Sequence, residues 1–408
     1  MGKLDRLIEE LCPNGVEYKS LKEIAVVSGA GVDKKINTNE QPIKLLNYMD
    51  VYRNNYIDSS LDFMEVTASE NKISQCNVLK GDVFITPSSE VLNDIGNAAV
   101  ITEDLENVVY SYHIMRIRLK KRNFITSKYM GYIFESNYVQ TQINRYAEGI
   151  TRYGLTKTKW EGITIPLPPL PVQEEIVRIL DNFTELTAEL TAELTARKKQ
   201  YEYYRDELLT FGDEVEWKTL GEIATYSKER IEASELNKEN YIGVDNLLQD
   251  KRGKTESNFV PTEGRFTKYN PGNILIGNIR PYLRKIWFAD NYGGTNGDVL
   301  VINLKKEKYI CSKFLYYVLS SEEFFYYNIK NSRGAKMPRG NKTMIMKYKI
   351  PIPPLAEQER IVSILDKFDA LVNDISIGLP AEIEARQKQY EYYREKLLSF
   401  KELDRKEA

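Results

Sequence analysis

The feature that most constrains the fold of this chain is an internal repeat. Residues 165–183 read IPLPPLPVQEEIVRILDNF and return, 185 positions later, as IPIPPLAEQERIVSILDKF at residues 350–368. Residues 197–211, RKKQYEYYRDELLTF, return 189 positions later as RQKQYEYYREKLLSF at residues 386–400. Because self-similarity along a sequence indicates repeated structural units, we expect two copies of one frame.

A third match shows where the differing segments lie. VEYKSLKEIA at residues 16–25 corresponds to VEWKTLGEIA at residues 215–224, so repeated segments bound each variable block. The connecting segments match while the blocks differ, as expected if the frame has one task and the blocks have two. LIEEL at residues 7–11 precedes VEYKSL as RDELLTF precedes VEWKTL. We therefore expect the first residues to imitate the end of a repeated helix, which would make the arrangement pseudo-circular.

Both repeated segments read as long helices that follow a proline cluster. The clusters PLPPLP and PIPPL cannot continue a helix or a central strand, and the residues after them alternate at heptad spacing. In the first copy this seam comprises Ile176, Leu180, Phe183, Thr187, Leu190, Leu194, Arg197, Tyr201, Tyr204 and Leu208. In the second copy Gly378 and Pro380 predict a broken helix with Pro380 in the first turn of its second part. The copies could form an antiparallel pair, and an intermolecular coiled coil is the alternative.

Each variable block has the pattern of a mixed α/β domain. Predicted strands occupy residues 83–87, 97–102, 114–120, 273–279, 285–289 and 299–305, and predicted helices occupy residues 127–136 and 312–321. The predicted fold class is α/β (α+β), with two similar mixed domains separated by two long helices packed as an antiparallel coiled-coil pair. The predicted domains are residues 1–165 and 213–350, and the predicted helical segments are residues 166–212 and 351–408.

Charge is distributed unevenly along the chain. The formal net charge is −2, yet residues 213–350 hold 23 Lys and Arg against 17 Asp and Glu, while the first block is nearly neutral. Residues 330–349 contain seven basic residues and no acidic one. A clustered basic surface is the electrostatic footprint of a nucleic-acid binder. Arg can bond a guanine edge through two hydrogen bonds, whereas Lys mainly contacts phosphate.

Two segments of each block are therefore predicted DNA contacts. In the second block they are residues 278–286 and 330–349, with the candidates Arg280, Arg284, Lys285, Arg333, Lys336, Arg339 and Lys342. In the first block they are residues 86–94 and 144–159, with the candidates Ser88, Ser89, Arg145, Arg152, Lys157 and Lys159. For any one of these residues, an ordinary solvated surface position is the alternative.

The sequence offers little material for catalysis. His113 is the one histidine, so neither a Ser–His–Asp triad nor a zinc site can be assembled around it. We expect it to be a structural residue on a strand. The glycine loops at residues 149–154 and 340–343 depart from the phosphate-binding motif, and the Pro-Pro pairs lack the context of a base-methylating motif. Heptad spacing favours packing over base stacking for the YEYYR tyrosines.

The chain also has the composition of a cytoplasmic protein. Cys12, Cys76 and Cys311 show no CxxC spacing, which suggests reduced thiols. No apolar run approaches the length of a membrane span, and the charged first residues are unlike an export signal.

These motifs resemble a known family. IPLPPLPVQEEIVRIL and IPIPPLAEQERIVSIL, each ahead of a helix ending in QYEYYR-x-x-LL-x-F, are similar to the two conserved regions of type I restriction–modification specificity subunits. The TAEL tandem within residues 187–194 resembles the spacer repeat of one subclass. The resemblance implies that each variable block is a target recognition domain for one half of a bipartite DNA site. It also implies that the helices separate these domains and dock methyltransferase subunits, a role carried over to Pro169, Gln173, Ile176, Leu180, Pro354, Gln358, Ile361 and Leu365.

The resemblance further implies that this chain has no catalytic residues and binds no metal or cofactor. The implied partners are double-stranded DNA, two methyltransferase (modification) subunits that use S-adenosylmethionine, and motor–nuclease (restriction) subunits that use ATP and Mg. The alternative is a coiled-coil scaffold with two protein-interaction domains and no DNA role. A stand-alone nuclease or methyltransferase is disfavoured by the missing motifs.

Overall fold

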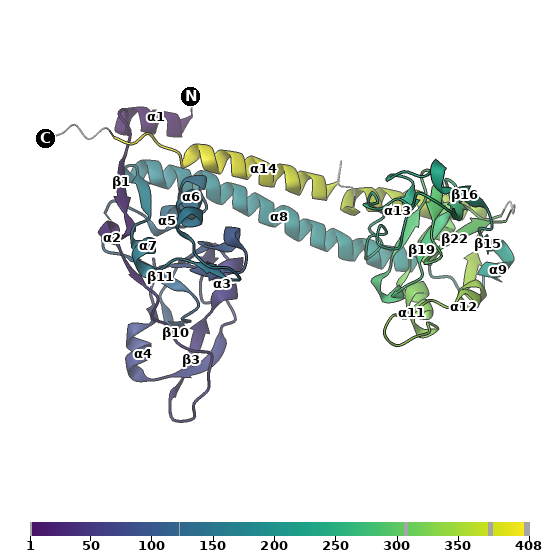
Figure 1. Cartoon of the computed structure of the whole chain (residues 1–408), viewed down its shortest axis with the longest axis horizontal. Coiled ribbons are helices and arrows are strands. Elements are labelled where there is room, and N and C mark those ends of the chain that lie inside the picture. The colour runs from purple at the N-terminus through teal and green to yellow at the C-terminus, as the bar shows by residue number, and fades with distance from the viewer. Residues whose placement is uncertain (1, 122, 306–308, 374–377, 404–408) are drawn as a thin grey trace. The chain divides into compact units, whose positions relative to one another are not determined.

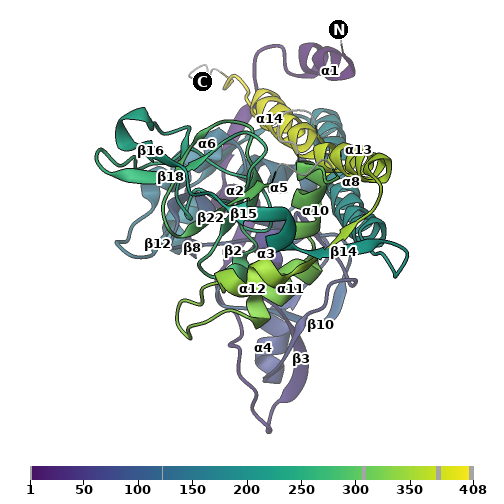
Figure 2. The ribbon, with the colours of Figure 1, turned by 90° about the vertical axis from the view of Figure 1, so that its right-hand side faces the viewer.

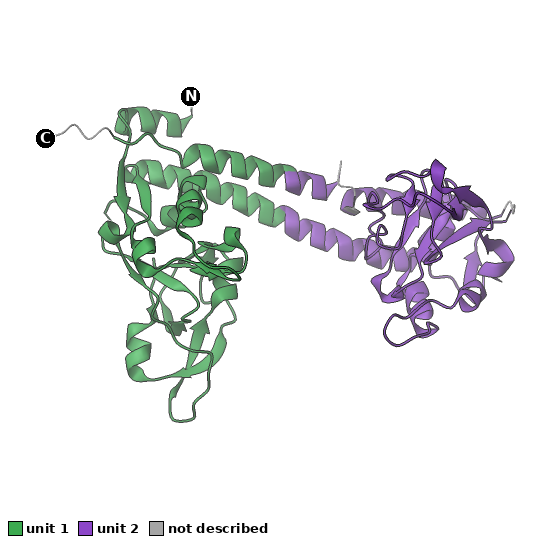
Figure 3. Cartoon of the chain, in the orientation of Figure 1, with its two compact units in different colours: residues 1–189, 385–408 green, residues 190–384 purple. Residues whose placement is uncertain are grey.

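The computed structural model describes residues 2–121, 123–305, 309–373 and 378–403 (Figure 1). The chain forms two compact units, distinguished by colour in Figure 3. Unit 1 comprises Met1–Glu189 with Ala385–Ala408, and unit 2 comprises Leu190–Glu384. Each unit thus combines one variable block with parts of both repeated segments. The predicted division of the chain into domains at residues 1–165 and 213–350 and helical segments at residues 166–212 and 351–408 is not tested by these units and stays a prediction.

Unit 1 contains a five-stranded sheet in the order β2–β11–β7–β9–β4 and a four-stranded sheet in the order β5–β3–β10–β6. Two further pairs are β1–β13 and β12–β8. Its strands are β1 Glu17–Ser20, β2 Ala25–Ser28, β3 Gln41–Leu46, β4 Tyr56–Ile57, β5 Met64–Ala68, β6 Asn77–Val78, β7 Val83–Ile85, β8 Ser88–Ser89, β9 Ala98–Ile101, β10 Leu105–Tyr110, β11 Met115–Leu119, β12 Tyr153–Gly154 and β13 Thr164–Leu167. Its helices before the long one are α1 Lys3–Leu11, α2 Leu21–Ile24, α3 Tyr48–Arg53, α4 Glu70–Gln75, α5 Ser127–Phe134, α6 Asn137–Tyr146 and α7 Lys157–Glu161.

Unit 2 contains two four-stranded sheets, in the orders β15–β22–β19–β20 and β16–β18–β21–β17, and the pair β14–β23. Its strands are β14 Glu216–Thr219, β15 Ala224–Tyr226, β16 Arg230–Glu232, β17 Tyr241–Ile242, β18 Arg265–Tyr269, β19 Ile274–Gly277, β20 Ile286–Phe288, β21 Gly293–Thr295, β22 Val299–Leu304 and β23 Lys349–Ile352. Its short helices are α9 Leu220–Ile223, α10 Ser312–Leu319, α11 Glu322–Lys330 and α12 Lys342–Lys347.

The two units share one frame, as predicted. The strand predictions are confirmed as β7, β9 and β11 in unit 1 and as β19, β20 and β22 in unit 2, and the helix predictions as α5 and α10. Strands β7, β9 and β19 are continuous apolar runs in which every residue is buried, whereas β11 alternates apolar residues with Arg116 and Arg118. Buried side chains of α5 and α10 contribute to the main core of each unit. The antiparallel pairs β1–β13 and β14–β23 have the same register in both units.

The repeated segments form the long helices that the heptad pattern predicts. The first is α8, Leu170–Leu208, and the second is broken into α13, Leu355–Asn373, and α14, Leu379–Leu397. Pro380 lies in the first turn of α14, where its missing N–H costs no hydrogen bond. Residues 374–377 lie outside the described part of the chain. The predicted break of the second helix is therefore confirmed.

Within each unit, parts of the two repeats pack against each other in opposite directions. In unit 1 the ring of Phe183 on α8 stacks on Tyr393 of α14, with 5.5 Å between ring centroids. In unit 2, Tyr201 and Tyr204 of α8 contact Phe368 of α13 at 6.3 and 5.9 Å. In both views of the ribbon, α14 lies beside the first part of α8 (Figures 1 and 2). The predicted antiparallel pairing is thus present in each unit.

The pseudo-circular arrangement is present, but another segment closes it. In unit 2 the end of α8 packs into the core through Tyr201, Leu208, Leu209 and Phe211. In unit 1 the residues 189 positions later, at the end of α14, pack into the core in the same way: Tyr390, Leu397, Leu398 and Phe400. The backbone of Val16 then pairs with Lys401 and Leu403. The expectation that the first residues imitate this helix end was wrong, because α1 is a separate helix that buries Leu4.

No helix within the described ranges is both long and apolar enough to cross a membrane.

Candidate nucleic-acid interface

In unit 2 the two predicted DNA-contact segments lie side by side. The chain leaves β19 at Gly277, and the N–H of Arg280 then donates to the carbonyl oxygen of Pro338 at 2.7 Å. An isolated β-bridge joins Ile279 to Arg339. Arg280 and Arg284 both adopt left-handed backbone conformations, with φ of 51° and 50°, which is uncommon for residues other than glycine. This turn and the basic run after α11 therefore form one edge.

In unit 1 the corresponding segments meet in the same way. Strand β8 pairs with β12, so that Ser88 lies opposite Gly154 and Ser89 opposite Tyr153. The guanidinium of Arg152 reaches across this pair and donates from Nε to the Ser88 hydroxyl oxygen at 3.0 Å. From the sequence, the two segments of each block were predicted as separate candidates. In both units the fold brings them together.

Five predicted contact residues are exposed and available. They have no ion pair or side-chain hydrogen bond among the described residues: Arg145, Arg280, Arg333, Lys336 and Lys342. An unpaired surface cation loses no internal partner on meeting a phosphate or a base edge. The assignment of these residues as DNA contacts stays a prediction.

Other predicted contact residues are held by their own unit. Arg284 pairs with Glu322 at 3.0 Å, and the Lys285 ammonium donates to the carbonyl oxygen of Val244 at 2.7 Å. Burial lowers the pKa of Lys285. Exposed pairs join Arg339 to Asp298, Lys157 to Glu161 and Lys159 to Glu148. Ser89 is buried and its hydroxyl oxygen accepts from the backbone of Val91, so its side chain is not available to DNA.

His113 lies in a turn before β11, not on a strand as predicted. Its ring packs on that of Tyr112, with 4.0 Å between centroids. Burial lowers the pKa of His113, and the positive charges of Lys34 and Arg152 lower it further.

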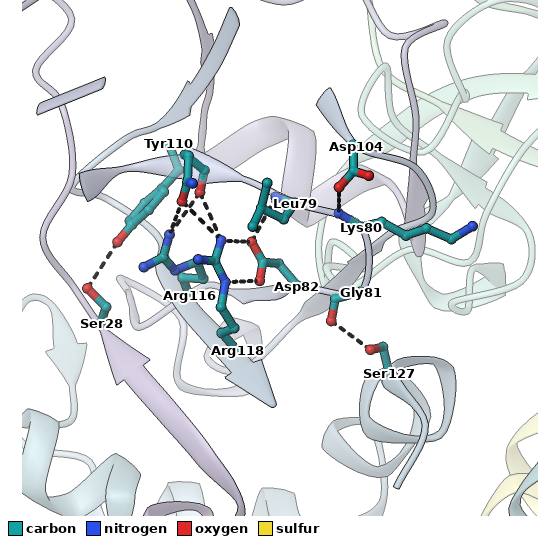
Figure 4. Close-up of polar contacts among 11 residues, drawn as sticks. Ser28, Leu79, Lys80, Gly81, Asp82, Asp104, Tyr110, Arg116, Arg118 and Ser127 are labelled. Atoms are coloured by element: carbon teal, nitrogen blue, oxygen red, sulfur yellow. Dashed lines mark hydrogen bonds and ion pairs between the residues drawn. The ribbon is translucent and has the colours of Figure 1, made fainter. Parts of the chain in front are cut away.

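Two arginines of β11 are directed into unit 1 and do not belong to this edge (Figure 4). Arg118 forms a two-point ion pair with the fully buried carboxylate of Asp82, at 2.6 and 2.7 Å. Arg116 donates to the carbonyl oxygen of Asn77 at 2.8 Å and lies over the ring of Tyr110. Their role is to support the sheet. Among the described residues no group of His, Cys, Asp and Glu has a metal-binding arrangement.

The residues predicted to dock a partner lie mostly inside the molecule. Six of the eight are fully buried: Gln173, Ile176, Leu180, Gln358, Ile361 and Leu365. Only Pro169 and Pro354, at the helix starts, keep some exposure. The match between the repeats identified residues that both copies need. The structure shows that the matched apolar residues are needed for packing and not for contact with a partner. A docking surface built from these six side chains is therefore inconsistent with their burial.

The two buried glutamines fasten each long helix to its own unit. In unit 1, Gln173 Nε2 donates to the carbonyl oxygens of Phe124 and Pro168, both at 2.7 Å. Gln173 Oε1 accepts from the N–H of Thr126 at 3.0 Å. In unit 2, Gln358 makes the same three hydrogen bonds with Tyr309, Pro353 and Cys311. Each glutamine side chain is fully buried and thus satisfies three backbone groups from within the unit, one of them through a buried hydrogen bond.

Sequence reasoning missed an exposed apolar residue at each of two hairpin tips on this edge. Ile150 is 93% exposed and Met337 is 53% exposed. Both lie at the tips of short hairpins between the cations of the predicted contact runs. Aligning Gly149 with Gly334, 185 positions apart, would have marked the two tips as equivalent, but exposure cannot be predicted from the sequence.

Comparison with known proteins shows the family of this chain. The model of the type I restriction modification DNA specificity domain matches it twice, at residues 13–197 and 212–385, and the chain belongs to this family. It is 39% identical over 283 residues to the EcoR124I/EcoR124II specificity subunit of Escherichia coli, covering 64% of this chain and 69% of that one. It is 37% identical over 274 residues to a putative specificity subunit, S.HindORF215P, of Haemophilus influenzae, covering 62% of this chain and 68% of that one.

Solved structures share the fold. The S subunit of the type I restriction–modification system of M. genitalium superposes with a TM-score of 0.54 at 14% identity, over 94% of this chain and 96% of that one. A chain from a type I system, solved to explain complex assembly and conformational transition, gives a TM-score of 0.61 at 16% identity, over 95% and 98%. With its family, the chain is a DNA-recognition subunit and a non-catalytic component of a restriction–modification complex. The alternative of a scaffold without a DNA role is set aside.

Proposed function

We propose that each unit reads one half of a bipartite target on double-stranded DNA and that α8 sets the gap between the halves. The observation that carries this proposal is the joining, in both units, of two separate loop segments into one edge with exposed cations. Phosphate contacts from such cations orient a protein on the duplex, while contacts to base edges provide specificity.

The partners that we propose are two methyltransferase subunits and motor–nuclease subunits. The former would use S-adenosylmethionine and the latter ATP and Mg, while this chain would bind no cofactor. Together with the free thiols of Cys12, Cys76 and Cys311, these partners are consistent with a cytoplasmic location, which stays a prediction.

A variant lacking residues 191–194 tests the role of α8. One four-residue unit contributes about 6 Å of helix and turns the chain by only about 40°. Since base pairs are about 3.4 Å apart, we expect the gap to shrink by one or two base pairs while both half-sites keep their sequences. Methylome sequencing of cells that express the variant with its modification subunit measures both quantities.

The matched control replaces residues 191–194 by four alanines, which preserves helix length because alanine is the best helix former. This control is expected to keep the original gap. Changed half-sites with an unchanged gap would rule out the proposed role of α8.

For the docking surface, we propose a different set of residues on the same helices. Buried matches between the repeats are accounted for by packing, whereas exposed matches need another reason. Near the end of each repeat the exposed identical positions are Lys199, Glu202 and Tyr203 in α8, and Lys388, Glu391 and Tyr392 in α14. Tyr203 is 65% and Tyr392 is 63% exposed. Exposed aromatic residues are typical anchors of protein interfaces, and two equal patches fit two copies of one partner.

The variants Tyr203→Ala and Tyr392→Ala test this surface. Each is expected to weaken one of two partner sites by about tenfold or more, as the loss of an interface anchor does, and the double variant is expected to weaken both. Titration calorimetry with the methyltransferase subunit measures affinity and stoichiometry. Lys198→Ala is the control, because Lys198 is exposed but corresponds to Gln387 in the second repeat. Two unaltered sites in the double variant would contradict the assignment.

A further inference from the structure

The two units carry one hairpin in the same structural position. In unit 1, Glu148 and Gly154 exchange two backbone hydrogen bonds of 3.0 Å, and in unit 2, Arg333 and Arg339 exchange two of 2.9 and 2.8 Å. The residues of the second pair lie 185 positions after the corresponding residues of the first pair, which is the offset of the neighbouring repeat. Each hairpin therefore encloses a tip of five residues, 149–153 in unit 1 and 334–338 in unit 2.

The first residue of each tip is a glycine in the left-handed region. Gly149 has φ of 139° and Gly334 has φ of 98°. A Cβ atom at residue 149 would lie 1.9 Å from the carbonyl oxygen of Arg152, so no other residue fits there. At these two positions the tight turn requires glycine, which explains why this residue alone is common to both tips.

The second strand of each hairpin pairs with the segment that directly follows β7 in unit 1 and β19 in unit 2. In unit 1, Gly154 pairs with Ser88, and in unit 2, Arg339 pairs with Ile279. The hairpin base is thus tied on both sides by backbone hydrogen bonds, which do not depend on side-chain identity. A base of this kind can carry different tip side chains without a change of backbone.

After the glycine, the two tips differ at every position. Residues 150–153 read Ile-Thr-Arg-Tyr and residues 335–338 read Ala-Lys-Met-Pro. Ile150 is 93% exposed, while Arg152 is drawn back to Ser88. In unit 2, Met337 is 53% exposed, next to the exposed and unpaired Lys336. An apolar side chain has nothing to gain from a phosphate, whereas the thymine methyl group in the major groove is an apolar partner.

We propose that these two tips are the base-reading elements of the chain, with Ile150 and Met337 as the apolar contacts to base edges. The inference rests on the proposed function, since it locates specificity within the edge assigned there. In unit 1, Ile150 contacts a thymine methyl group. In unit 2, Met337 makes the apolar contact and Lys336 donates to a guanine edge, which accepts at O6 and N7. The common glycine and the paired base hold both tips at the same place in the fold, so a change of tip alters only the sequence that is read.

The test uses the variants Ile150→Ala and Met337→Ala in complex with the modification subunit. We expect Ile150→Ala to lower discrimination roughly tenfold at one or two positions of one half-site, with the other half-site unchanged. Met337→Ala is expected to relax the other half-site alone. Methylome sequencing measures the frequency of each base at every target position. Ile36→Ala, at another exposed isoleucine of unit 1 (78% exposed), is the control and is expected to leave both half-sites unchanged.

Two outcomes would overturn the inference. One is an unchanged base preference in both variants, and the other is a uniform loss of modification across all sequences, which indicates a phosphate contact. Unfolding temperatures equal to that of the unsubstituted chain are expected, because both side chains are exposed, and they separate loss of reading from loss of folding. If the unsubstituted chain gives a bipartite motif and both variants keep the same base preference, only this inference is refuted. The absence of any bipartite motif from the unsubstituted chain defeats the proposed function itself.

Discussion

Replacing Gln173 by leucine is expected to lower the free energy of unfolding of unit 1 by about 3 kcal/mol or more. Leucine fits the volume but cannot hydrogen-bond, so the carbonyl oxygens of Phe124 and Pro168 and the N–H of Thr126 lose their partner. Gln173 is fully buried, and each buried backbone group left without a partner costs about 1–3 kcal/mol. The loss also loosens the start of α5, because the Thr126 side chain caps this helix.

Urea unfolding followed by hydrogen exchange of peptides from each unit measures this effect separately in the two units. Gln358→Leu is expected to cause a similar loss confined to unit 2, since Gln358 makes the same three bonds there. Glu174→Leu is the matched control: Glu174 is the exposed neighbour, and surface substitutions usually change stability by no more than about 0.5 kcal/mol. A loss below about 1 kcal/mol in Gln173→Leu would show that the glutamine does not fasten the helix.

Much of the frame could be predicted because its causes are local. Prolines fix the helix starts and the break in the second repeat, and the four–three alternation marks the less exposed positions of α8, where Ile176 and Leu180 are fully buried. The strands β7 and β9 follow from continuous apolar runs, and β11 follows from the alternation of Met115, Ile117 and Leu119 with two arginines. Each of these signals acts over a few residues, so one sequence is sufficient to detect it.

What could not be predicted depends on contacts between distant residues. Gln173 looked like a surface residue because a buried amide becomes favourable only when backbone groups of the folded unit surround it. The closure of unit 1 by Leu398, in place of α1, depends on packing that no local pattern encodes. The left-handed conformations of Arg280 and Arg284 have no glycine signal, and the exposure of Ile150 is a property of the hairpin rather than of its sequence.

A difference between the repeats leads to the second large expected effect. The arginine that ends each YEYYR motif is partly or fully buried, Arg394 in unit 1 and Arg205 in unit 2. In unit 1 the Glu135 carboxylate accepts from Tyr390 at 2.7 Å and pairs with Arg394 at 3.4 Å. Burial raises the pKa of the Tyr390 hydroxyl, and the negative charge of Glu135 raises it further, so the tyrosine stays a donor.

Glu135→Gln is therefore expected to destabilise unit 1 by about 1 kcal/mol, because it removes one of the two carboxylates that pair with a largely buried guanidinium and weakens the hydrogen bond from Tyr390. The measurement is again urea unfolding resolved by unit. Glu395, which also contacts Arg394 at 3.0 Å, keeps part of the charge balance, and the double variant with Glu395→Gln is expected to lose more. An unchanged free energy of unfolding in both variants would mean that this pair contributes nothing.

Unit 2 permits the converse experiment. The position that matches Glu135 is Ser320, whose hydroxyl donates to the carbonyl oxygen of Tyr316 at 2.7 Å and leaves Arg205 with Asp206 as its ion-pair partner. A cavity of about 400 Å³, lined in part by Tyr201, Arg205 and Ser320, leaves room for a longer side chain. Ser320→Glu is thus expected to stabilise unit 2 by about 1 kcal/mol through a charge-assisted hydrogen bond to Arg205.

Ser320→Gln separates charge from size. If the carboxylate is the cause, the glutamine variant gains nothing, because an amide fills the same cavity without neutralising Arg205. Equal stability of the two variants would show that filling the cavity, and not pairing the arginine, determines the effect. A loss of stability in Ser320→Glu would mean that the free energy of desolvating the new carboxylate exceeds the gain from its pairing with Arg205. In that case Asp206 already neutralises the buried arginine.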